Sequence, residues 1–272
     1  MSTQFGAIGG GVMGEALLSR LIAKQLYAPD AIVVSDPARE RREFLQQQYG
    51  VRVTADNREA AAADVVLLAV KPQVLEVVAA SLEGGKALKS ETLLISILAG
   101  VSLSRLSEAF GGQATIRAMP NTPATVGAGM TAIAASSQVT PSQIKLATTL
   151  FAAVGEVVEV SESLMDAVTG LSGSGPAFVA IFIEALADGG VKAGLPRAIA
   201  SKLARQTVLG TAQLLQETGI HPAELKDRVT SPGGTTIAGV AELENHGFRA
   251  AAIAAVEAAY RRSQALGRKS DE

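Results

Sequence analysis

The most constraining feature of the sequence is a glycine-rich turn close to its N-terminus. Residues 9–14 read Gly-Gly-Gly-Val-Met-Gly, a G-x-G-x-x-G pattern between a short apolar run, residues 4–9, and a stretch of helical periodicity, residues 13–24. In a strand–turn–helix unit this pattern lets the backbone approach a pyrophosphate and directs the N–H groups of a helix start at it. Glycine-rich turns also occur for structural reasons alone, but the context of this one predicts a dinucleotide-binding fold.

Segments with strand character alternate with helical segments up to about residue 117, and from about residue 160 the strand signal disappears. Alternation of this kind is typical of a parallel sheet covered by helices. The predicted strands are residues 31–35, 50–53, 64–70, 92–97 and 114–117, and the predicted helices of the second half are 165–193, 196–217, 222–229, 236–245 and 248–266. The fold class is therefore α/β, with a Rossmann-like doubly wound parallel sheet in residues 1–158 and an all-helical domain in residues 159–272.

Composition excludes several classes of function. The chain has 24 Lys and Arg against 26 Asp and Glu, so it lacks the basic surface expected of a nucleic-acid-binding protein. It has no Cys and two His, which excludes a disulfide framework, a thiol nucleophile and a Cys- or His-rich metal site. No stretch reads as a signal peptide or a membrane-spanning helix, so we expect a cytoplasmic protein.

The end of the second predicted strand bears on the choice of dinucleotide. Asp36 lies near the position where an acidic residue binds the ribose of NAD, although somewhat later than usual, whereas Ser35 and Arg39 suit the 2′-phosphate of NADP. Asp36-Pro37 also reads as an ordinary turn and helix start. From these residues alone the choice between the two cofactors stays open.

Three further loops follow predicted strands. Loops at the carboxyl ends of parallel strands line the ligand crevice, which makes Lys71-Pro72 and Ala99-Gly100 candidate walls of a cofactor site. Lys71 lies over a phosphate or ribose in one interpretation and is a solvated loop lysine in the other. The turn at residues 119–123, Met-Pro-Asn-Thr-Pro, either holds the nicotinamide end or is a rigid connector.

Two segments rich in Gly, Ser and Thr begin helices of the second half. Residues 169–176 allow either close helix packing or close approach of a cofactor. Residues 229–237 contain a Pro-Gly-Gly turn that exposes N–H groups and hydroxyls at a helix start, a suitable site for a small carboxylate. Thr235 or Thr236 would cap the helix in the structural alternative.

Together these motifs resemble the pyrroline-5-carboxylate reductase family from end to end. The matching segments, in order, are residues 9–14, 69–72, 119–123, 166–176, 187–191, 225–237 and 247–249. The most specific of them is 225–237, Leu-Lys-Asp-Arg-Val-Thr-Ser-Pro-Gly-Gly-Thr-Thr-Ile. The resemblance implies hydride transfer from NADPH, with NADH possible, to the cyclic imine 1-pyrroline-5-carboxylate, giving L-proline in the last step of proline biosynthesis.

The resemblance also implies roles for individual positions. The residues that would contact the dinucleotide are Ile8, Gly9, Gly10, Gly11, Val12, Met13, Ser35, Asn57, Ala69, Val70, Lys71, Pro72, Ala99 and Gly100. The residues that would hold the substrate are Val229, Ser231, Gly233, Gly234, Thr235 and Thr236, and the Thr236 hydroxyl would face the ring nitrogen as the catalytic group. The helical half would form a homodimer, with dimers assembling into a homodecamer, and whether Glu162 contacts substrate stays open.

Two other classes of protein share part of this pattern. Reductases of the β-hydroxyacid dehydrogenase type share the order of sheet and helices, but they place a lysine where this chain has Val179, which cannot do acid–base work. A non-catalytic nucleotide sensor would not need the carboxylate-binding turn at 231–236. We therefore expect an enzyme that contains no metal and acts mainly by positioning its reactants.

Overall fold

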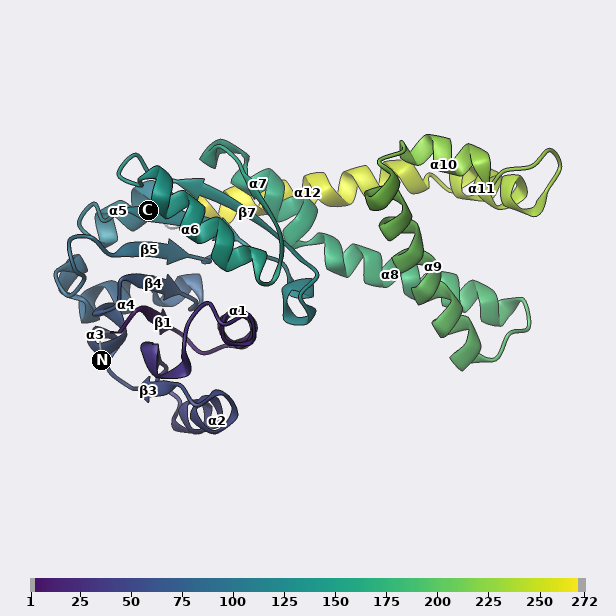
Figure 1. Cartoon of the computed structure of the whole chain (residues 1–272). Coiled ribbons are helices and arrows are strands. Elements are labelled where there is room, and N and C mark those ends of the chain that lie inside the picture. The colour runs from purple at the N-terminus through teal and green to yellow at the C-terminus, as the bar shows by residue number, and fades with distance from the viewer. Residues whose placement is uncertain (1–2, 269–272) are drawn as a thin grey trace. The chain divides into compact units, whose positions relative to one another are not determined.

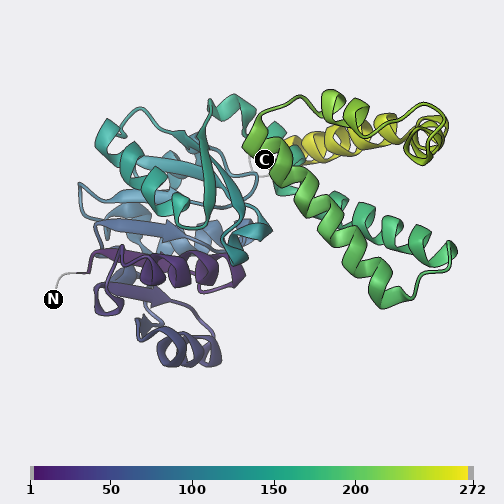
Figure 2. The same cartoon turned by 45° about the vertical axis from the view of Figure 1, so that its right-hand side comes forward.

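The computed structural model describes residues 3–268 and contains one eight-stranded sheet (Figures 1 and 2). The strand order is β3-β2-β1-β4-β5-β6-β7-β8, of which the first six strands have the Rossmann order. The strands are β1 (Phe5–Ile8), β2 (Ile32–Ser35), β3 (Arg52–Thr54), β4 (Val65–Leu68), β5 (Leu93–Ser96), β6 (Thr115–Met119), β7 (Gly129–Ala135) and β8 (Gly155–Glu159).

Twelve α-helices accompany the sheet in the part of the chain that is described. They are α1 (Val12–Ala23), α2 (Arg39–Tyr49), α3 (Asn57–Ala61), α4 (Leu75–Ser81), α5 (Leu103–Ala109), α6 (Pro141–Ala152), α7 (Met165–Val168), α8 (Gly175–Lys192), α9 (Arg197–Thr218), α10 (Pro222–Arg228), α11 (Thr235–Asn245) and α12 (Phe248–Arg268). The predicted α/β class with a helical second half is confirmed.

The sheet departs from the prediction of a parallel sheet at one strand. β7 runs antiparallel to β6, while β8 returns parallel to β7. Residues 120–128, which join β6 to β7, are too few for the crossover of a dozen or more residues that parallel neighbours require. The path from β7 to β8 contains α6 and is long enough. The strands β7 and β8 and the helix α6 were not among the predicted elements.

Strand alternation places two hydrophobic cores on opposite faces of the sheet. In β4, Val65 and Leu67 pack into one cluster with side chains of α1, α2 and α6, while Val66 and Leu68 pack into the other with side chains of α3, α4 and α5. All four β4 side chains are at most 2% exposed. A strand buried on both faces explains why residues 64–70 read as a continuous apolar run rather than an alternating one.

The long helix predicted for residues 165–193 is present, but a π-helical turn divides it. After α7, the π-helical turn η6 (Thr169–Gly173) precedes α8. The Thr169 hydroxyl donates to the Met165 carbonyl at 2.9 Å, and the Ser174 backbone N–H donates to the Thr169 carbonyl at 2.9 Å, five residues earlier. Hydroxyls that bond to the carbonyls of the preceding turn compete with α-helical hydrogen bonding, which explains the widened turn.

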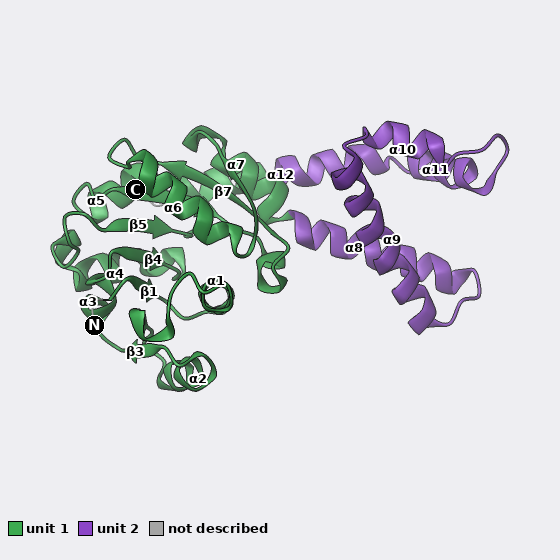
Figure 3. Cartoon of the chain, viewed as in Figure 1, with its two compact units in different colours: residues 1–174, 259–272 green, residues 175–258 purple. Residues whose placement is uncertain are grey.

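The chain divides into two compact units, one of residues 1–174 with 259–272 and one of residues 175–258 (Figure 3). The two units are defined by how compactly their residues pack. They do not test the predicted domain boundary between residues 158 and 159, which stays a prediction. In the helical unit, α8 and α9 pack through a small cluster of Ala187, Ala200 and Ala204.

Much apolar surface of the helical unit remains exposed. Ile181 is 65% exposed, Leu209 58% and Ile253 69%. Exposed apolar surface on this scale marks an interaction surface. By length and composition the segment Glu162–Lys192, with a mean hydropathy of 1.4, is also apolar enough to cross a membrane. A helix that packs against a second copy has the same composition, and the absence of a membrane segment stays a prediction.

A buried arginine joins distant parts of the sheet-containing unit. Arg117, in the middle of β6, lies 3.4 Å from the Glu162 carboxylate and 3.8 Å from the Asp166 carboxylate, and its side chain is 8% exposed. Glu162 also accepts a hydrogen bond from the Leu103 N–H at 2.5 Å, and Asp166 accepts one from the Ser263 hydroxyl at 2.7 Å. The network ties the start of α5, the segment before η6 and the end of α12 to the sheet.

Replacing this arginine should destabilise the fold. Arg117→Leu leaves two partly buried carboxylates without their cation, and we expect the free energy of unfolding to fall by about 2 kcal/mol, less than for a fully buried pair because both carboxylates reach solvent. Urea unfolding at fixed protein concentration measures the change. Arg39→Leu is the matched control, because Arg39 is 83% exposed in its ion pair with Glu43. Equal stabilities of the two variants would contradict the role of the network.

Candidate functional site

The carboxyl ends of four parallel strands lie in register at one edge of the sheet. Ile8 pairs with Ser35 on one side and Leu68 on the other, and Leu68 pairs with Ser96. The residues that follow these strand ends include Gly9, Ala69 and the loop that leads to Ala99 and Gly100. Parallel register therefore brings the predicted cofactor residues of four separate segments to the same edge.

The glycine turn is held between the strands that flank it. The Gly9 N–H donates to the Ser35 carbonyl, and the Ala69 N–H donates to the Ile8 carbonyl, both at 2.8 Å. Gly9 has a φ of +101°, and a Cβ there would lie 2.5 Å from the Ala69 carbonyl oxygen. A Cβ on Gly14 would lie 2.6 Å from the Gly9 carbonyl oxygen, so this glycine lets α1 approach the turn.

Gly11 differs from the other glycines of the motif. It is exposed and is the N-cap of α1, with a φ of −67° that any residue adopts. A Cβ built on Gly11 meets no described atom within 4 Å. The close backbone at this point thus faces open space at a helix N-terminus, which is the arrangement that accommodates a pyrophosphate. The residues present fit a dinucleotide.

The Asp36 carboxylate points to the glycine turn. One oxygen accepts the Gly10 N–H and the other accepts the Ala38 N–H, both at 2.9 Å. These contacts are those of a turn residue, the structural alternative for Asp36-Pro37. Arg39, the candidate for a 2′-phosphate, is 83% exposed and pairs with Glu43.

Ser35 and Asn57 form one hydrogen-bonded pair at the end of β2. Ser35 is 2% exposed and its hydroxyl donates to the Asn57 side-chain oxygen, while the Asn57 amide donates to the Ser81 hydroxyl at 2.9 Å. To donate a hydrogen bond to a cofactor, the Ser35 hydroxyl would have to leave Asn57, whereas its oxygen can still accept one. Asn57 is half-buried, so it is the more exposed of the two side chains.

The loops after β4 and β5 line a shared cavity of about 540 Å³. Pro72, Ala99 and Gly100, all predicted cofactor residues, contribute to its wall, together with Leu266 of α12 and the ion pair between Glu76 and Arg105 at 2.5 Å. Lys71 precedes Pro72 and is exposed; its carbonyl accepts the Val74 N–H at 3.1 Å, and its side chain makes no hydrogen bond or ion pair with the described residues. Both interpretations of Lys71 remain compatible with this position.

The predicted substrate turn lies in the helical unit. Gly233 has a φ of +66°, the Gly234 N–H donates to the Ser231 carbonyl at 3.0 Å, and α11 begins at Thr235. The N-cap of α11 is Gly234, without a side-chain cap, so the alternative that Thr235 or Thr236 caps this helix is wrong. The first backbone N–H groups of α11 therefore have no intrahelical acceptor, and the hydroxyl of half-buried Thr236 is not used as a cap.

Several residues have roles that the sequence did not indicate. Asn121 accepts the Met130 N–H at 2.8 Å and donates to the Ser172 carbonyl at 3.1 Å, so it ties the 119–123 turn to β7 and η6. Glu162 is engaged by Arg117 and Leu103. Arg41 and Glu15, beside the glycine turn, were also missed, because their partners are 26 and 31 residues away and carry no local motif.

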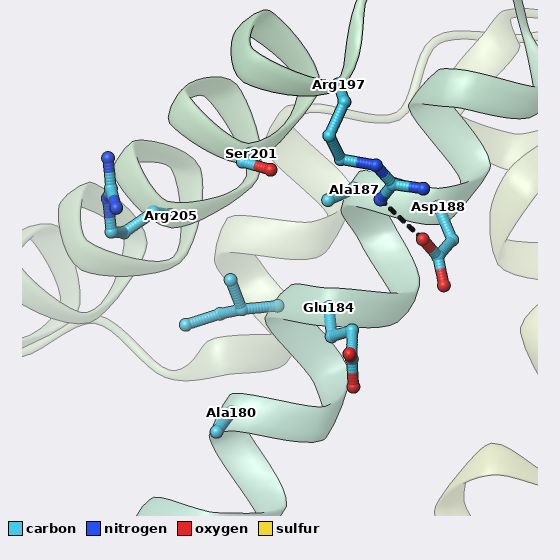
Figure 4. Close-up of a pocket in the computed structure, with 8 residues that line it drawn as sticks. Ala180, Glu184, Ala187, Asp188, Arg197, Ser201 and Arg205 are labelled. Atoms are coloured by element: carbon cyan, nitrogen blue, oxygen red, sulfur yellow. Dashed lines mark hydrogen bonds and ion pairs between the residues drawn. The ribbon is translucent and has the colours of Figure 1, made fainter.

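A second cavity, of about 570 Å³, lies between α8 and α9 within the helical unit (Figure 4). Its apolar floor includes Ala180 and Ala187, and its rim carries Glu184, Arg205 and the ion pair between Asp188 and Arg197 at 2.5 Å. None of the predicted site residues lines it. Within residues 3–268, no group of three His, Asp or Glu side chains is placed to hold a metal ion.

Two family models match the chain. The model described as pyrroline-5-carboxylate reductase dimerisation matches residues 162–266, and the model described as NADP oxidoreductase, coenzyme F420-dependent, matches residues 4–100. The first covers the helical half with its substrate turn, and the second covers the glycine turn and the loops after β2, β4 and β5.

Relatives named pyrroline-5-carboxylate reductase match over nearly the whole chain. That from Synechocystis is 67% identical, covering 99% of this chain and all of the relative, and that from Escherichia coli is 42% identical, covering 98% and all of the relative. Among solved structures, the enzyme from Coxiella burnetii has a TM-score of 0.91 at 37% identity, covering 98% of this chain and 99% of the other. The Plasmodium falciparum pyrroline carboxylate reductase with NADP bound has a TM-score of 0.87 at 32% identity, covering 97% and 98%.

The free space at Gly11 gives a direct test of the cofactor site. Gly11→Ala should raise the Kd for the dinucleotide by at least about tenfold, because the methyl group occupies the closest approach to the pyrophosphate. Its melting temperature should stay within about 2 °C of the parent, since the Cβ meets no protein atom. Calorimetric titration measures the affinity.

Gly14→Ala serves as the contrasting variant for this test. Its Cβ would press on the Gly9 carbonyl oxygen, so it should lower the melting temperature. Unchanged dinucleotide affinity in Gly11→Ala would show that the pyrophosphate lies elsewhere.

Proposed function

The chain belongs to the pyrroline-5-carboxylate reductase family, and from that premise we propose how its residues bind the two reactants and support the reaction. The reaction is the transfer of a hydride from NADPH to the C=N bond of 1-pyrroline-5-carboxylate, which gives L-proline in the last step of proline biosynthesis. The single observation that carries the residue assignment is the open cradle at Gly11, at the edge where four strand ends meet.

The dinucleotide binds along this edge of the sheet. N–H groups at the start of α1 hold the pyrophosphate, Asn57 with Ser35 behind it supports the adenosine side, and the loops after β4 and β5 form the wall toward the nicotinamide. The proposed cofactor residues are Ile8, Gly9, Gly10, Gly11, Val12, Met13, Ser35, Asn57, Ala69, Val70, Lys71, Pro72, Ala99 and Gly100. NADPH bound there supplies the hydride, and NADH can replace it.

The substrate carboxylate binds at the turn before α11. The free N–H groups of a helix start form an anion site, and the Pro232-Gly233-Gly234 turn presents them without bulky side chains. The proposed substrate residues are Val229, Ser231, Gly233, Gly234, Thr235 and Thr236. A bound carboxylate fixes one end of the ring and thereby the position of the imine.

Thr236 is the proposed catalytic residue. Its hydroxyl is not used to cap α11, so it is available to the ring nitrogen as that nitrogen changes from imine to amine. A cyclic imine is readily protonated and then accepts a hydride without strong acid catalysis. The hydroxyl thus orients the ring and donates one hydrogen bond, while the N–H groups of the turn hold the carboxylate.

Assembly follows from the helical unit. The family match and the exposed apolar side chains of α8, α9 and α12 support homo-oligomerisation. We propose a homodimer formed through this unit, with dimers assembling into a homodecamer in the cytoplasm. Charged groups are few on α8, and its small residues suit close packing against a second copy.

The hydroxyl of Thr236 can be tested by two substitutions. Thr236→Ala should lower kcat by about tenfold to a thousandfold, because it removes one hydrogen bond made in the transition state. Thr236→Ser restores the donor and should recover most of the activity. Steady-state rates with pyrroline-5-carboxylate, followed by nicotinamide absorbance, measure both.

Properties that do not depend on the Thr236 hydroxyl serve as controls for this test. Dinucleotide affinity, melting temperature and oligomeric state should stay at the parent values in both variants, since Thr236 caps no helix. A Thr236→Ala protein with normal kcat at saturating substrate would remove Thr236 from the mechanism.

A further inference from the structure

Both backbone polar groups of Gly10 are hydrogen-bonded to side chains. Its N–H donates to the Asp36 carboxylate at 2.9 Å, and its carbonyl accepts a hydrogen bond from the Arg41 Nε. Gly10 itself is buried, and Asp36 and Arg41 come from the loop after β2 and from α2. Gly10, between the first two glycines of the motif, is thus fixed by two charged groups from another segment of the chain, 26 and 31 residues further on.

Arg41 is in turn fixed by the surrounding residues. Its guanidinium pairs with the Glu15 carboxylate in the first turn of α1, and it lies 5.0 Å from the centre of the Phe44 ring. The other Glu15 oxygen accepts the Tyr49 hydroxyl at 2.7 Å. The Arg41 and Glu15 side chains are only 27% and 26% exposed, so solvent screens their pair incompletely.

The ionisation of these groups agrees with a tightly held cluster. Burial acts to raise the pKa of Glu15, but hydrogen bonds from Arg41 and Tyr49 and the charge of Arg41 outweigh it, and the net pKa is lowered. Burial and the hydrogen bond to Glu15 raise the pKa of Tyr49 to about 12. Glu15 is therefore an anion and Tyr49 a donor throughout the physiological range.

We propose that Asp36 and Arg41 are positioning residues that preorganise the dinucleotide loop, and that Asp36 consequently supports NADPH and NADH alike instead of selecting between them. The inference rests on the proposed function, because it takes this loop to be the pyrophosphate site. It assigns the acidic residue at the end of β2 to the loop, whereas an acid near this position commonly binds the ribose of NAD.

The geometry gives the physical reason. Both Asp36 oxygens accept backbone N–H groups, and the Arg42 guanidinium donates to the Asp36 carbonyl at 2.8 Å. A carboxylate that accepts the Gly10 and Ala38 N–H groups through separate oxygens is oriented by those bonds, so the loop sets its geometry before a ribose is bound. Because Asp36 uses the Gly10 N–H, the pyrophosphate donors are the N–H groups from Gly11 onward, at the start of α1.

The test measures dinucleotide affinity in two variants. Asp36→Asn replaces one carboxylate oxygen by an NH2 group, which would face a backbone N–H donor without an acceptor between them. Arg41→Gln removes the side chain that joins the Gly10 carbonyl to the Glu15 carboxylate. Each should raise the Kd for NADPH and for NADH by about tenfold, with the ratio of the two Kd values unchanged, since loop order is lost equally for both. The KM for NADPH should rise similarly, while kcat at saturating NADPH and the KM for pyrroline-5-carboxylate stay at parent values.

Two matched controls separate this effect from loss of charge. Asp30→Asn and Arg52→Gln change the same residue types in the same unit, at exposed positions without contact to the loop, and should leave both Kd values unchanged. Arg41→Lys keeps the charge but offers one nitrogen in place of the Nε and Nη2 that Arg41 uses for Gly10 and Glu15, and should give an intermediate Kd. If Asp36→Asn does not fold, the Arg41 series alone decides.

Two results would overturn the proposal. A shift of the NADPH to NADH ratio in Asp36→Asn would show that the carboxylate reads the ribose. A lower melting temperature with both Kd values unchanged would show a role in stability only. Failure of the proposed function is seen separately, because the unmodified protein would then bind neither dinucleotide.

Discussion

The parallel main-chain register at the carboxyl ends of β1, β2, β4 and β5 is the constraint on which the proposed cofactor site depends. Two backbone hydrogen bonds, from Gly9 to Ser35 and from Ala69 to Ile8, align the strand ends with the glycine turn between them. Every loop that we assign to the dinucleotide begins within a few residues of these aligned strand ends. A slip by one residue would move every side chain of these strands from one hydrophobic core to the other and disrupt the packing of both, so the sheet holds these loops in fixed relation.

The glycines of the turn meet this constraint in different ways. Gly9 supplies a positive φ, Gly14 lets α1 approach, and Gly11 leaves open space at the start of α1, where we propose that the phosphates bind. The peptide between Gly9 and Gly11 is fixed by Asp36 and Arg41. If the turn binds the phosphates as we propose, these side chains order it before the ligand arrives, which lowers the entropy lost on binding.

The helical half is organised by a different principle. Its described cluster of buried apolar residues is small and consists mainly of alanines, whereas larger apolar side chains on α8, α9 and α12 face outward. A unit of this kind gains most of its stabilising burial from a second copy. The substrate turn belongs to this unit, so in the proposed function the geometry of substrate binding depends on assembly as well as on the fold of one chain.

The sequence by itself determined the features whose signals are local. The G-x-G-x-x-G turn, the alternation of strands and helices and the turn before α11 were predicted because each is encoded within a dozen neighbouring residues. The same local motifs carried the family resemblance.

Only the tertiary structure decided the features that depend on distant partners. The antiparallel direction of β7 follows from the short path from β6, and the hydrogen bond from the Gly10 N–H to Asp36 joins residues 26 positions apart. In the network of Arg117, Asp166 and Ser263, the hydrogen bond between Ser263 and Asp166 alone joins residues 97 positions apart. The chemistry of a side chain limits which groups it can bind. Only the folding of the chain brings one of those groups within hydrogen-bonding distance.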